Sequence, residues 1–269
     1  MSSTAKALTL LSHFSPARPE IGLSQLCRIA GRDKATTYRH LQALEKTGFV
    51  EQNPATRQYR LGPALLQLAQ VREATVPRKE GARPPLSALA NATGETAHVT
   101  VLSGSTLYGL AECESPLHGI RAVIDLNIFP LHATASGICA LAFGPKELMS
   151  AATQNMARFT ETTPTSAEAL AALVTATRVT GFGHASKSYE TDIQGLAAPI
   201  FDHTGHFAGA VAVACVAARF TDELEQKIKS ELVIAARAIT HNWGGTIPRG
   251  IETAWARSVT PFKSLEPTS

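Results

Sequence analysis

Cationic and short hydrogen-bonding side chains crowd into one stretch near the start of the chain. They are Lys34, Thr36, Thr37, Arg39 and His40. Arginine recognises guanine through paired hydrogen bonds, and lysine and threonine side chains contact phosphate oxygens. This set of groups therefore indicates a segment that reads DNA, in which Arg39 is the best candidate for a base contact.

The flanking sequence predicts the elements that would position this segment. Two short helical runs, at 24–30 and 34–47, each end at a glycine, and the second has apolar residues at helical spacing. Residues 49–50 and 58–61 then predict a two-stranded ribbon around the loop NPAT. Helix, tight turn, helix and ribbon form a winged helix-turn-helix, whose second helix enters the major groove.

Two further cations lie on the predicted ribbon, or wing. Arg57 and Arg60 are expected to contact phosphate rather than bases. Two interpretations of Tyr38 remain open, since it can pack inward or contact a phosphate. The alternative for the whole run is a solvated helix face, but the combination of helix, turn, glycine stop and wing favours DNA recognition.

Charge and length fit a DNA-binding head on a larger body. Residues 1–75 hold ten Lys and Arg against five Asp and Glu, whereas the remainder holds 15 against 17. A length of 269 residues suggests two domains. We predict a DNA-binding domain at 1–62, a helical linker at 63–83 and a second domain at 84–245.

The second domain is predicted to be α+β, with an antiparallel sheet flanked by helices. A helix break is expected at Gly81 and Pro84-Pro85, and the hydrophobic period changes from helical to alternating after Gly94. Residues 246–269 show no period and are predicted to be a disordered tail. The predicted strands span 95–102, 106–112, 182–189, 195–201 and 207–216, and the main helices span 135–143, 167–179 and 221–243.

Other kinds of site find little support in the sequence. The four cysteines are widely spaced in apolar surroundings, which fits reduced core residues of a cytoplasmic protein. His203 and His206 form an HxxH pair, but a metal site needs three or four ligands. There is no dinucleotide fingerprint, no phosphate-binding glycine loop and no nucleophile elbow. No apolar run is predicted to span a membrane or to act as a signal peptide. We therefore expect no metal, no cofactor and no membrane association.

The order of these features resembles the IclR family of bacterial transcriptional regulators over about residues 5–245. The resemblance rests on LSQLCRIAG, KATTYRHLQALEKTGFVE and YRLG in the head. In the body it rests on TGETAHV (93–99), PLHATASG (130–137) and GLAAPIFD (195–202). It implies a winged helix-turn-helix joined to a GAF-like effector domain. It also implies a homodimer or dimer of dimers on a palindromic operator, and a small carboxylate or aromatic effector.

The resemblance also implies where that effector would bind. It places Arg121 on a loop that lines the pocket, where a guanidinium matches a carboxylate, although a surface arginine is the alternative. It places the effector acid at the helix start formed by Ala135, Ser136 and Gly137, for which simple close packing is the alternative. The remaining pocket residues are expected to be Phe129, Ile193, Gly195, Ala212 and Ala214.

The two alanines mark a departure from the family. Relatives commonly have serine or another small polar residue at the positions of Ala212 and Ala214. The pocket is therefore expected to be more apolar than usual, and its acid larger than a two-carbon one.

The sequence as a whole predicts a ligand-responsive, DNA-binding transcriptional regulator. An enzyme that uses the second domain as its active site is the main alternative. A purely structural DNA-binding protein is another, but its large, nearly neutral body would then have no evident use.

Overall fold

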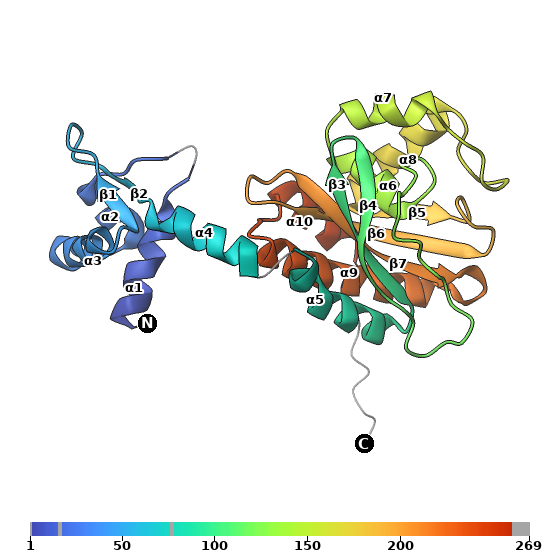
Figure 1. Cartoon of the computed structure of the whole chain (residues 1–269), viewed down its shortest axis with the longest axis horizontal. Helices are drawn as coiled ribbons and strands as arrows, with labels where there is room; N and C mark the ends of the chain where they lie inside the picture. Colours follow the sequence, from blue (N-terminus) through green and yellow to red (C-terminus); the bar gives the residue numbers. More distant parts are fainter. Residues whose placement is uncertain (1, 16–17, 76–77, 260–269) are drawn as a thin grey trace, which may run out of the picture. The chain divides into compact units, whose positions relative to one another are not determined.

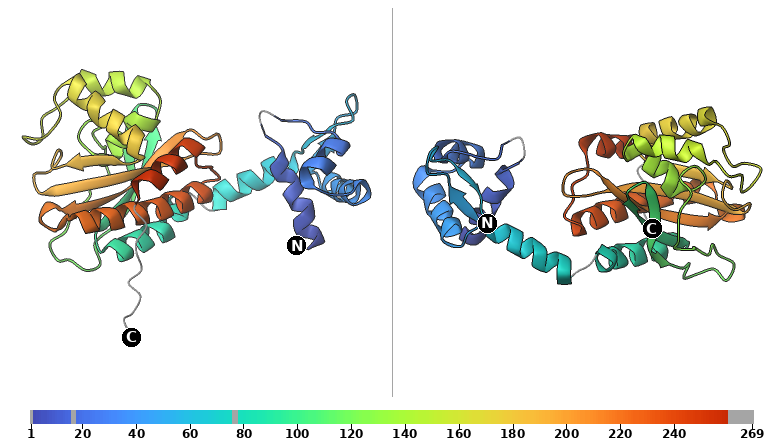
Figure 2. Two further views of the ribbon diagram at one scale, coloured as in Figure 1. Left: turned by 180° about the vertical axis from the view of Figure 1, so that it is seen from behind. Right: turned by 45° about the horizontal axis from the view of Figure 1, so that its top comes forward.

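The computed structural model describes residues 2–15, 18–75 and 78–259. The chain divides into two compact units, Met1–Pro77 and Arg78–Ser269 (Figures 1 and 2). Each unit has a hydrophobic core of its own, which is the property that defines a domain. The division falls within the stretch that the sequence predicts to be a linker.

The first unit is a winged helix-turn-helix. β1 and β2 pair antiparallel, with Glu51 opposite Arg60. Leu10, Leu26 and Leu41 are completely buried and join the helices into one small core. The elements are α1 (Ser3–Thr9), a 3-10 turn (Leu10–His13), α2 (Leu23–Ala30), α3 (Lys34–Lys46), β1 (Val50–Gln52), β2 (Tyr59–Leu61) and α4 (Ala64–Thr75).

A glycine and an aspartate define the tight turn between α2 and α3. Gly31 ends α2 in the left-handed conformation, with a φ of 63°. Asp33 caps α3, because its side chain accepts the backbone N–H of Thr36 at 2.8 Å. Hydrogen bonds from Thr36 also hold the pKa of Asp33 below its usual range. The cap fixes where α3 begins and which of its residues form the first turn.

The second unit is built on one antiparallel sheet with the strand order β4-β3-β7-β6-β5 (Figure 1). The predicted α+β architecture is therefore confirmed. The strands are β3 (Thr96–Ser103), β4 (Thr106–Cys113), β5 (Gly183–Ser186), β6 (Ile193–Phe201) and β7 (Phe207–Val216).

Helices cover both faces of this sheet, and the side chains of β7 alternate between them. Val211 and Val213 face the core that contains α5 (Arg78–Thr93) and α9 (Asp222–Asn242). Ala210 and Ala212 face the opposite core, which contains α6 (Ala135–Phe143), α7 (Glu147–Gln154) and α8 (Ala167–Thr180). Small residues on this second face allow α6 to lie close to the sheet.

The helix break predicted at Gly81 and Pro84-Pro85 is wrong, because α5 runs through all three residues. Pro85 has no backbone N–H, so the carbonyl of Gly81 loses its partner within the helix. The side-chain amide of Asn242 in α9 donates to that carbonyl at 2.8 Å and restores the hydrogen bond. Packing against α9 therefore overrides the local effect of the prolines.

The tail predicted to be disordered is helical over α10 (Arg249–Ser258). Trp255 is 1% exposed, and its Nε1 donates to the carbonyl of Gly181 at 2.9 Å. Gly181 has a φ of +81°, and a Cβ there would lie 2.5 Å from the indole. The sequence signal for this helix is the spacing of its buried residues, Ile251, Ala254 and Trp255. Residues 260–269 lie outside the described residues.

Candidate functional site

The outward face of α3 is formed by residues at helical spacing. Lys34, Tyr38, Arg39 and Gln42 are exposed, as is the small side chain of Ala35. The Gln42 amide donates to the Tyr38 hydroxyl at 3.0 Å, so Tyr38 points outward rather than into the core. Of the predicted DNA contacts, Lys34 and Arg39 lie on this face, and Thr36 is half-buried beside it. Sequence analysis missed Ala35 and Gln42, which the helical period counted from Leu41 would have identified.

Two predicted DNA contacts lie on the inner face of α3 instead. Thr37 is completely buried, and its hydroxyl donates to the Asp33 carbonyl at 2.9 Å. His40 is 8% exposed, and its Nε2 lies 3.1 Å from the Ser3 hydroxyl of α1. Burial, with the nearby cation Arg32, holds the pKa of His40 below its usual range. Both residues hold α3 in place rather than reach DNA.

The two wing arginines differ in their surroundings. Arg57 is exposed at a φ of 60°, and the described residues offer its guanidinium no carboxylate partner. Arg60 pairs with Glu51 at 2.6 Å and lies 3.7 Å from Glu20. Arg57 is therefore free to contact phosphate, whereas the charge of Arg60 is largely compensated.

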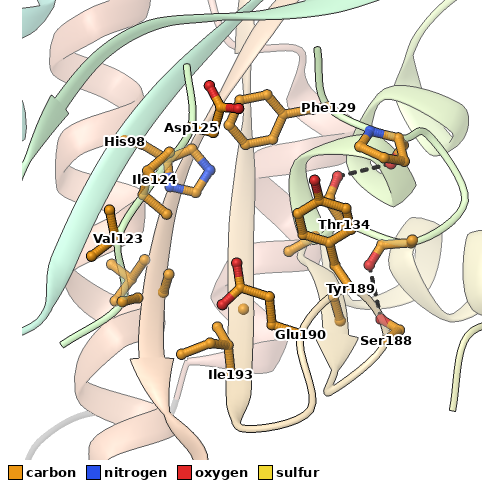
Figure 3. Close-up of a pocket in the computed structure, with 18 of the residues that line it drawn as sticks. His98, Val123, Ile124, Asp125, Phe129, Thr134, Ser188, Tyr189, Glu190 and Ile193 are labelled. Atoms are coloured by element: carbon orange, nitrogen blue, oxygen red, sulfur yellow. Dashed lines mark hydrogen bonds between the residues drawn. The ribbon is translucent and has the colours of Figure 1, made fainter. Parts of the chain in front are cut away.

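The second unit contains a cavity of about 130 Å³ above the sheet (Figure 3). Its walls come from β3, the irregular segment 122–130, the start of α6 and the segment that joins β5 to β6. The lining residues labelled in Figure 3 are His98, Val123, Ile124, Asp125, Phe129, Thr134, Ser188, Tyr189, Glu190 and Ile193.

The N-terminus of α6 forms one wall of the cavity. The Thr134 hydroxyl caps the helix by accepting the N–H of Gly137 at 3.0 Å. Within the described residues, the N–H groups of Ala135 and Ser136 have no hydrogen-bond partner. Free N–H groups at the positive end of a helix are suited to an anion or a carbonyl oxygen.

A buried histidine is the second polar feature of the cavity. His98 is 6% exposed, stacks on Phe129 at 5.1 Å, and places Nε2 3.3 Å from the Ser136 hydroxyl. Burial lowers the pKa of His98 to about 4, so the imidazole is neutral at physiological pH. Its Nδ1 is buried and has no hydrogen-bond partner in the described part of the chain.

The charged side chains of the cavity are acidic. Asp125 and Glu190 are exposed lining residues (Figure 3), and neither Lys nor Arg is among the residues that line the cavity. An anion inside the cavity would therefore depend on backbone N–H groups rather than on a cation.

The structure brings most of the predicted effector residues together. Ser136 reaches the cavity through its contact with His98, whereas Gly137 and Ala212 are buried behind the lining. His98 was not among the predicted effector residues, although Thr96, His98 and Thr100 form a polar stripe on a buried strand face. The predicted residues that line the cavity are Phe129, Ala135, Ile193, Gly195 and Ala214.

Arg121 does not line the cavity, so the prediction that it binds the effector carboxylate is wrong. Its Nη2 lies 2.5 Å from the Glu114 carboxylate, and its Nη1 donates to the Gly119 carbonyl at 3.4 Å. An arginine that already has a carboxylate partner close by gains little by turning towards a ligand.

A buried ion pair holds the segment that leads into the cavity wall. Glu95 is 1% exposed and accepts hydrogen bonds from Arg219 at 2.8 and 2.7 Å, while His118 lies 3.6 Å away. Arg219 also donates to the carbonyl of Ile120 at 3.1 Å. These contacts tie residues 118–120, which immediately precede the lining residues, to the sheet.

Two further kinds of site are absent from the described part of the chain. No three His, Cys, Asp or Glu side chains gather there in a way that could hold a metal ion. None of the described helices is both long and apolar enough to cross a membrane.

Both units match known protein families. Residues 3–54 match the IclR helix-turn-helix domain, and residues 75–241 match the family described as bacterial transcriptional regulator IclR C-terminal. The chain therefore belongs to the IclR family. It is a transcriptional regulator with a DNA-binding domain, not an enzyme.

Individual relatives agree with this assignment. The chain is 36% identical to an IclR-type regulator from Silicibacter sp. TM1040 whose structure is solved, with a TM-score of 0.87 over 93% of this chain and 99% of that one. It is 25% identical to the regulator XynR of Escherichia coli K12, over 90% of this chain and 97% of XynR. A more distant IclR homologue, from Microbacterium hydrocarbonoxydans in complex with 4-hydroxybenzoate, shares the fold at 22% identity, with a TM-score of 0.55 over 90% and 99% of the two chains.

Proposed function

We propose that this regulator changes its affinity for an operator when a small organic acid binds the cavity above the sheet. The observation that carries the proposal is a cavity against the start of α6, where the N–H groups of Ala135 and Ser136 are unpaired, in a chain of this family. A ligand shifts DNA binding only by as much as it favours one arrangement of the chain over another. The acid must therefore bind the DNA-competent and DNA-incompetent states with different affinities.

The size of the cavity limits the acid to a small molecule. A cavity of about 130 Å³ is close to the size, roughly 150 Å³, that accommodates benzene in an engineered protein core. A single aromatic ring or a short branched chain would contact Phe129 and Ile193. Its carboxylate would accept the N–H groups of Ala135 and Ser136, where the helix dipole favours negative charge.

The proposed DNA contacts follow the exposed surface of the first unit. Arg39 and Gln42 would contact base edges, Lys34 and Tyr38 would contact bases or nearby phosphates, and Arg57 on the wing would contact phosphate. One helix-turn-helix covers one half-site, so we propose a homodimer on a palindromic operator.

Exposed apolar residues in the first unit support self-association. Leu66, Leu68 and Val71 of α4 are 70%, 53% and 58% exposed, and Leu8 of α1 is 48% exposed. Large apolar side chains exposed in such number on two short helices favour a partner that covers them. Light scattering of the full chain tests the proposal, and a monomer both alone and with operator DNA would contradict it.

The test of ligand response combines two measurements on the full-length chain. Operator duplexes are selected from a random DNA pool, and binding is followed by fluorescence anisotropy with and without single-ring and branched acids, including 4-hydroxybenzoate. Thermal unfolding shows whether the same acids bind, since a ligand of the folded state raises the melting temperature. An acid that stabilises the protein but leaves operator affinity unchanged would contradict the proposal.

A cavity-filling variant provides the matched control. Ala214 lines the cavity, whereas Ala218 is exposed outside it. Ala214→Leu is expected to keep operator binding and to lose the response to the acid, and Ala218→Leu is expected to keep both. Equal responses of the two variants would place the acid elsewhere.

A further inference from the structure

We propose that His98 selects the effector, and that the effector is a monocarboxylic acid carrying a hydroxyl group that hydrogen-bonds to His98 Nδ1. The inference rests on the proposed function of the cavity as an effector site. It goes further by naming the group that the cavity recognises besides the carboxylate, and the residue that recognises it.

The position of His98 carries the first step. The imidazole lies in the cavity wall, and its contact with Ser136 places it against the first turn of α6 (Figure 3). A molecule with its acid at the N–H groups of Ala135 and Ser136 therefore has its next atoms within reach of the ring. In a cavity of this size, a single small ligand can occupy both places.

The unpaired Nδ1 carries the second step. Ser136 satisfies Nε2, and the ring is fixed by its stack on Phe129, so the residue is held in one orientation. Nδ1 nevertheless has no partner among the described residues, although buried polar atoms are nearly always hydrogen-bonded. A buried, unpaired nitrogen on a fixed side chain that lines a cavity is suited to a polar atom of a ligand.

The protonation state decides which ligand group fits. Because burial keeps the imidazole neutral, His98 offers a hydrogen bond and not a positive charge for a carboxylate. Nδ1 donates or accepts according to the tautomer that the Ser136 contact selects. A hydroxyl group can accept from Nδ1 in one tautomer and donate to it in the other, which makes it the best match.

The acidic lining residues of the cavity limit the charge of the ligand. Asp125 and Glu190 would repel a second carboxylate, and no Lys or Arg side chain lines the cavity to offset that repulsion. A hydroxy monocarboxylate fits this arrangement, whereas a dicarboxylate does not.

The experiment compares matched pairs of acids that differ only in the hydroxyl group. Isothermal titration calorimetry on the full-length chain measures 4-hydroxybenzoate against benzoate, and 3-hydroxybutyrate against butyrate. For the wild type we expect at least one hydroxy acid to bind ten- to a hundredfold more tightly than its partner, because the partner leaves Nδ1 buried and unpaired. A wild type that binds every partner as tightly as its hydroxy acid overturns the inference.

Three substitutions separate the roles of the two ring nitrogens. His98→Phe keeps the aromatic stack and removes both nitrogens. His98→Gln retains a polar group near Nε2, and His98→Asn retains one near Nδ1. We expect the preference for the hydroxy acid to disappear in His98→Phe and His98→Gln and to persist in part in His98→Asn. An unchanged preference in His98→Phe overturns the inference.

A spectroscopic measurement tests the contact in the wild type, and the variants serve only to assign the resonances. The ¹⁵N resonances of the wild-type histidines are recorded, and His98 is assigned by its absence from His98→Gln or His98→Asn. The hydroxy acid should shift the Nδ1 resonance of His98, and its partner acid should not. Equal shifts with both acids overturn the inference.

The outcome also distinguishes this inference from the proposed function. If acids bind and release the operator but substitution of His98 does not change the preference, only the role of His98 is lost. If no acid binds the wild type or alters operator affinity, the proposed function fails and this inference fails with it.

Discussion

The DNA-reading surface and the effector cavity are built in opposite ways. The first is one face of a single helix, α3, with its cap at Asp33 and its inner face packed on α1 and α2. The second takes its walls from β3, segment 122–130, α6, the β5–β6 connection and the ends of β6 and β7. A change in α3 should therefore act locally, whereas a change that loosens one wall of the cavity should affect the whole second unit.

The largest expected effect is a loss of stability of the whole second unit when one contact behind the cavity wall is removed. Arg219→Ala removes the main partner of Glu95, which is 1% exposed, and leaves a buried carboxylate beside only His118 and the Cys215 thiol. We expect the free energy of unfolding of this unit to fall by about 3–5 kcal/mol, as is typical when a buried pair is broken. Chemical denaturation measures the loss.

The partner substitution sharpens that result. In Glu95→Gln the remaining Arg219 can reach water, because its side chain is 28% exposed. This variant should therefore lose less stability than Arg219→Ala. Equal losses would show that the Glu95–Arg219 contact itself dominates, rather than the unpaired buried charge or the hydrogen bond from Arg219 to the Ile120 carbonyl.

The next effect depends on pH. The pKa of His98 falls from 6.5 to about 4 in the folded state, so between these values the unfolded chain binds a proton that the folded chain does not. The free energy of unfolding is therefore unaffected by this group above pH 6.5 and decreases as the pH falls towards 4. The decrease is at most about 3 kcal/mol. The acid sensitivity of unfolding should be smaller in His98→Phe. If the free energy of unfolding depends on pH equally in both proteins, groups other than His98 cause the acid sensitivity.

The smallest effect concerns the DNA-reading surface. Arg39→Ala should cost roughly 1–3 kcal/mol of operator binding and relax the preference at one base pair, because a bidentate base contact is lost. Arg57→Ala should weaken all sequences alike and reduce the dependence on salt, because only a phosphate contact is lost. Anisotropy titrations over a salt series distinguish them. If Arg39→Ala changes neither affinity nor preference, α3 is not the recognition helix.

The sequence predicts more of the DNA-reading surface than of the cavity, because the surface belongs to one helix whereas the cavity is assembled from distant segments. The helical period locates α3, and counted four residues back from Leu41 and Leu44 it places Thr37 and His40 on the inner face. Both were predicted to contact DNA because their residue types were considered without that period. For the cavity, the helix start at Ala135 was found from its small residues. Arg121 was misplaced because its pairing with Glu114 is a tertiary contact. His98 could not be assigned to the cavity because its partner Ser136 lies 38 residues away.

The course of α5 and the presence of α10 were also beyond a local interpretation of the sequence. Proline and glycine are reliable signals of helix breaks only where no neighbour replaces the missing hydrogen bond. Here Asn242 supplies it, from a helix more than a hundred residues away. The tail was judged by its lack of period, although three apolar residues at helical spacing suffice once Gly181 leaves room for an indole ring.

The packing of α10 has a practical consequence for spectroscopy. The chain has two tryptophans, and both lie in the second unit. Trp255 is buried beside Phe182, and Trp243 donates to the Arg78 carbonyl while the Arg78 guanidinium lies 5.3 Å from its ring. Tryptophan emission therefore follows the second unit alone, and the DNA-binding unit contributes none. The native protein thus carries its own optical label, which can report unfolding or ligand binding in one unit without any engineered dye.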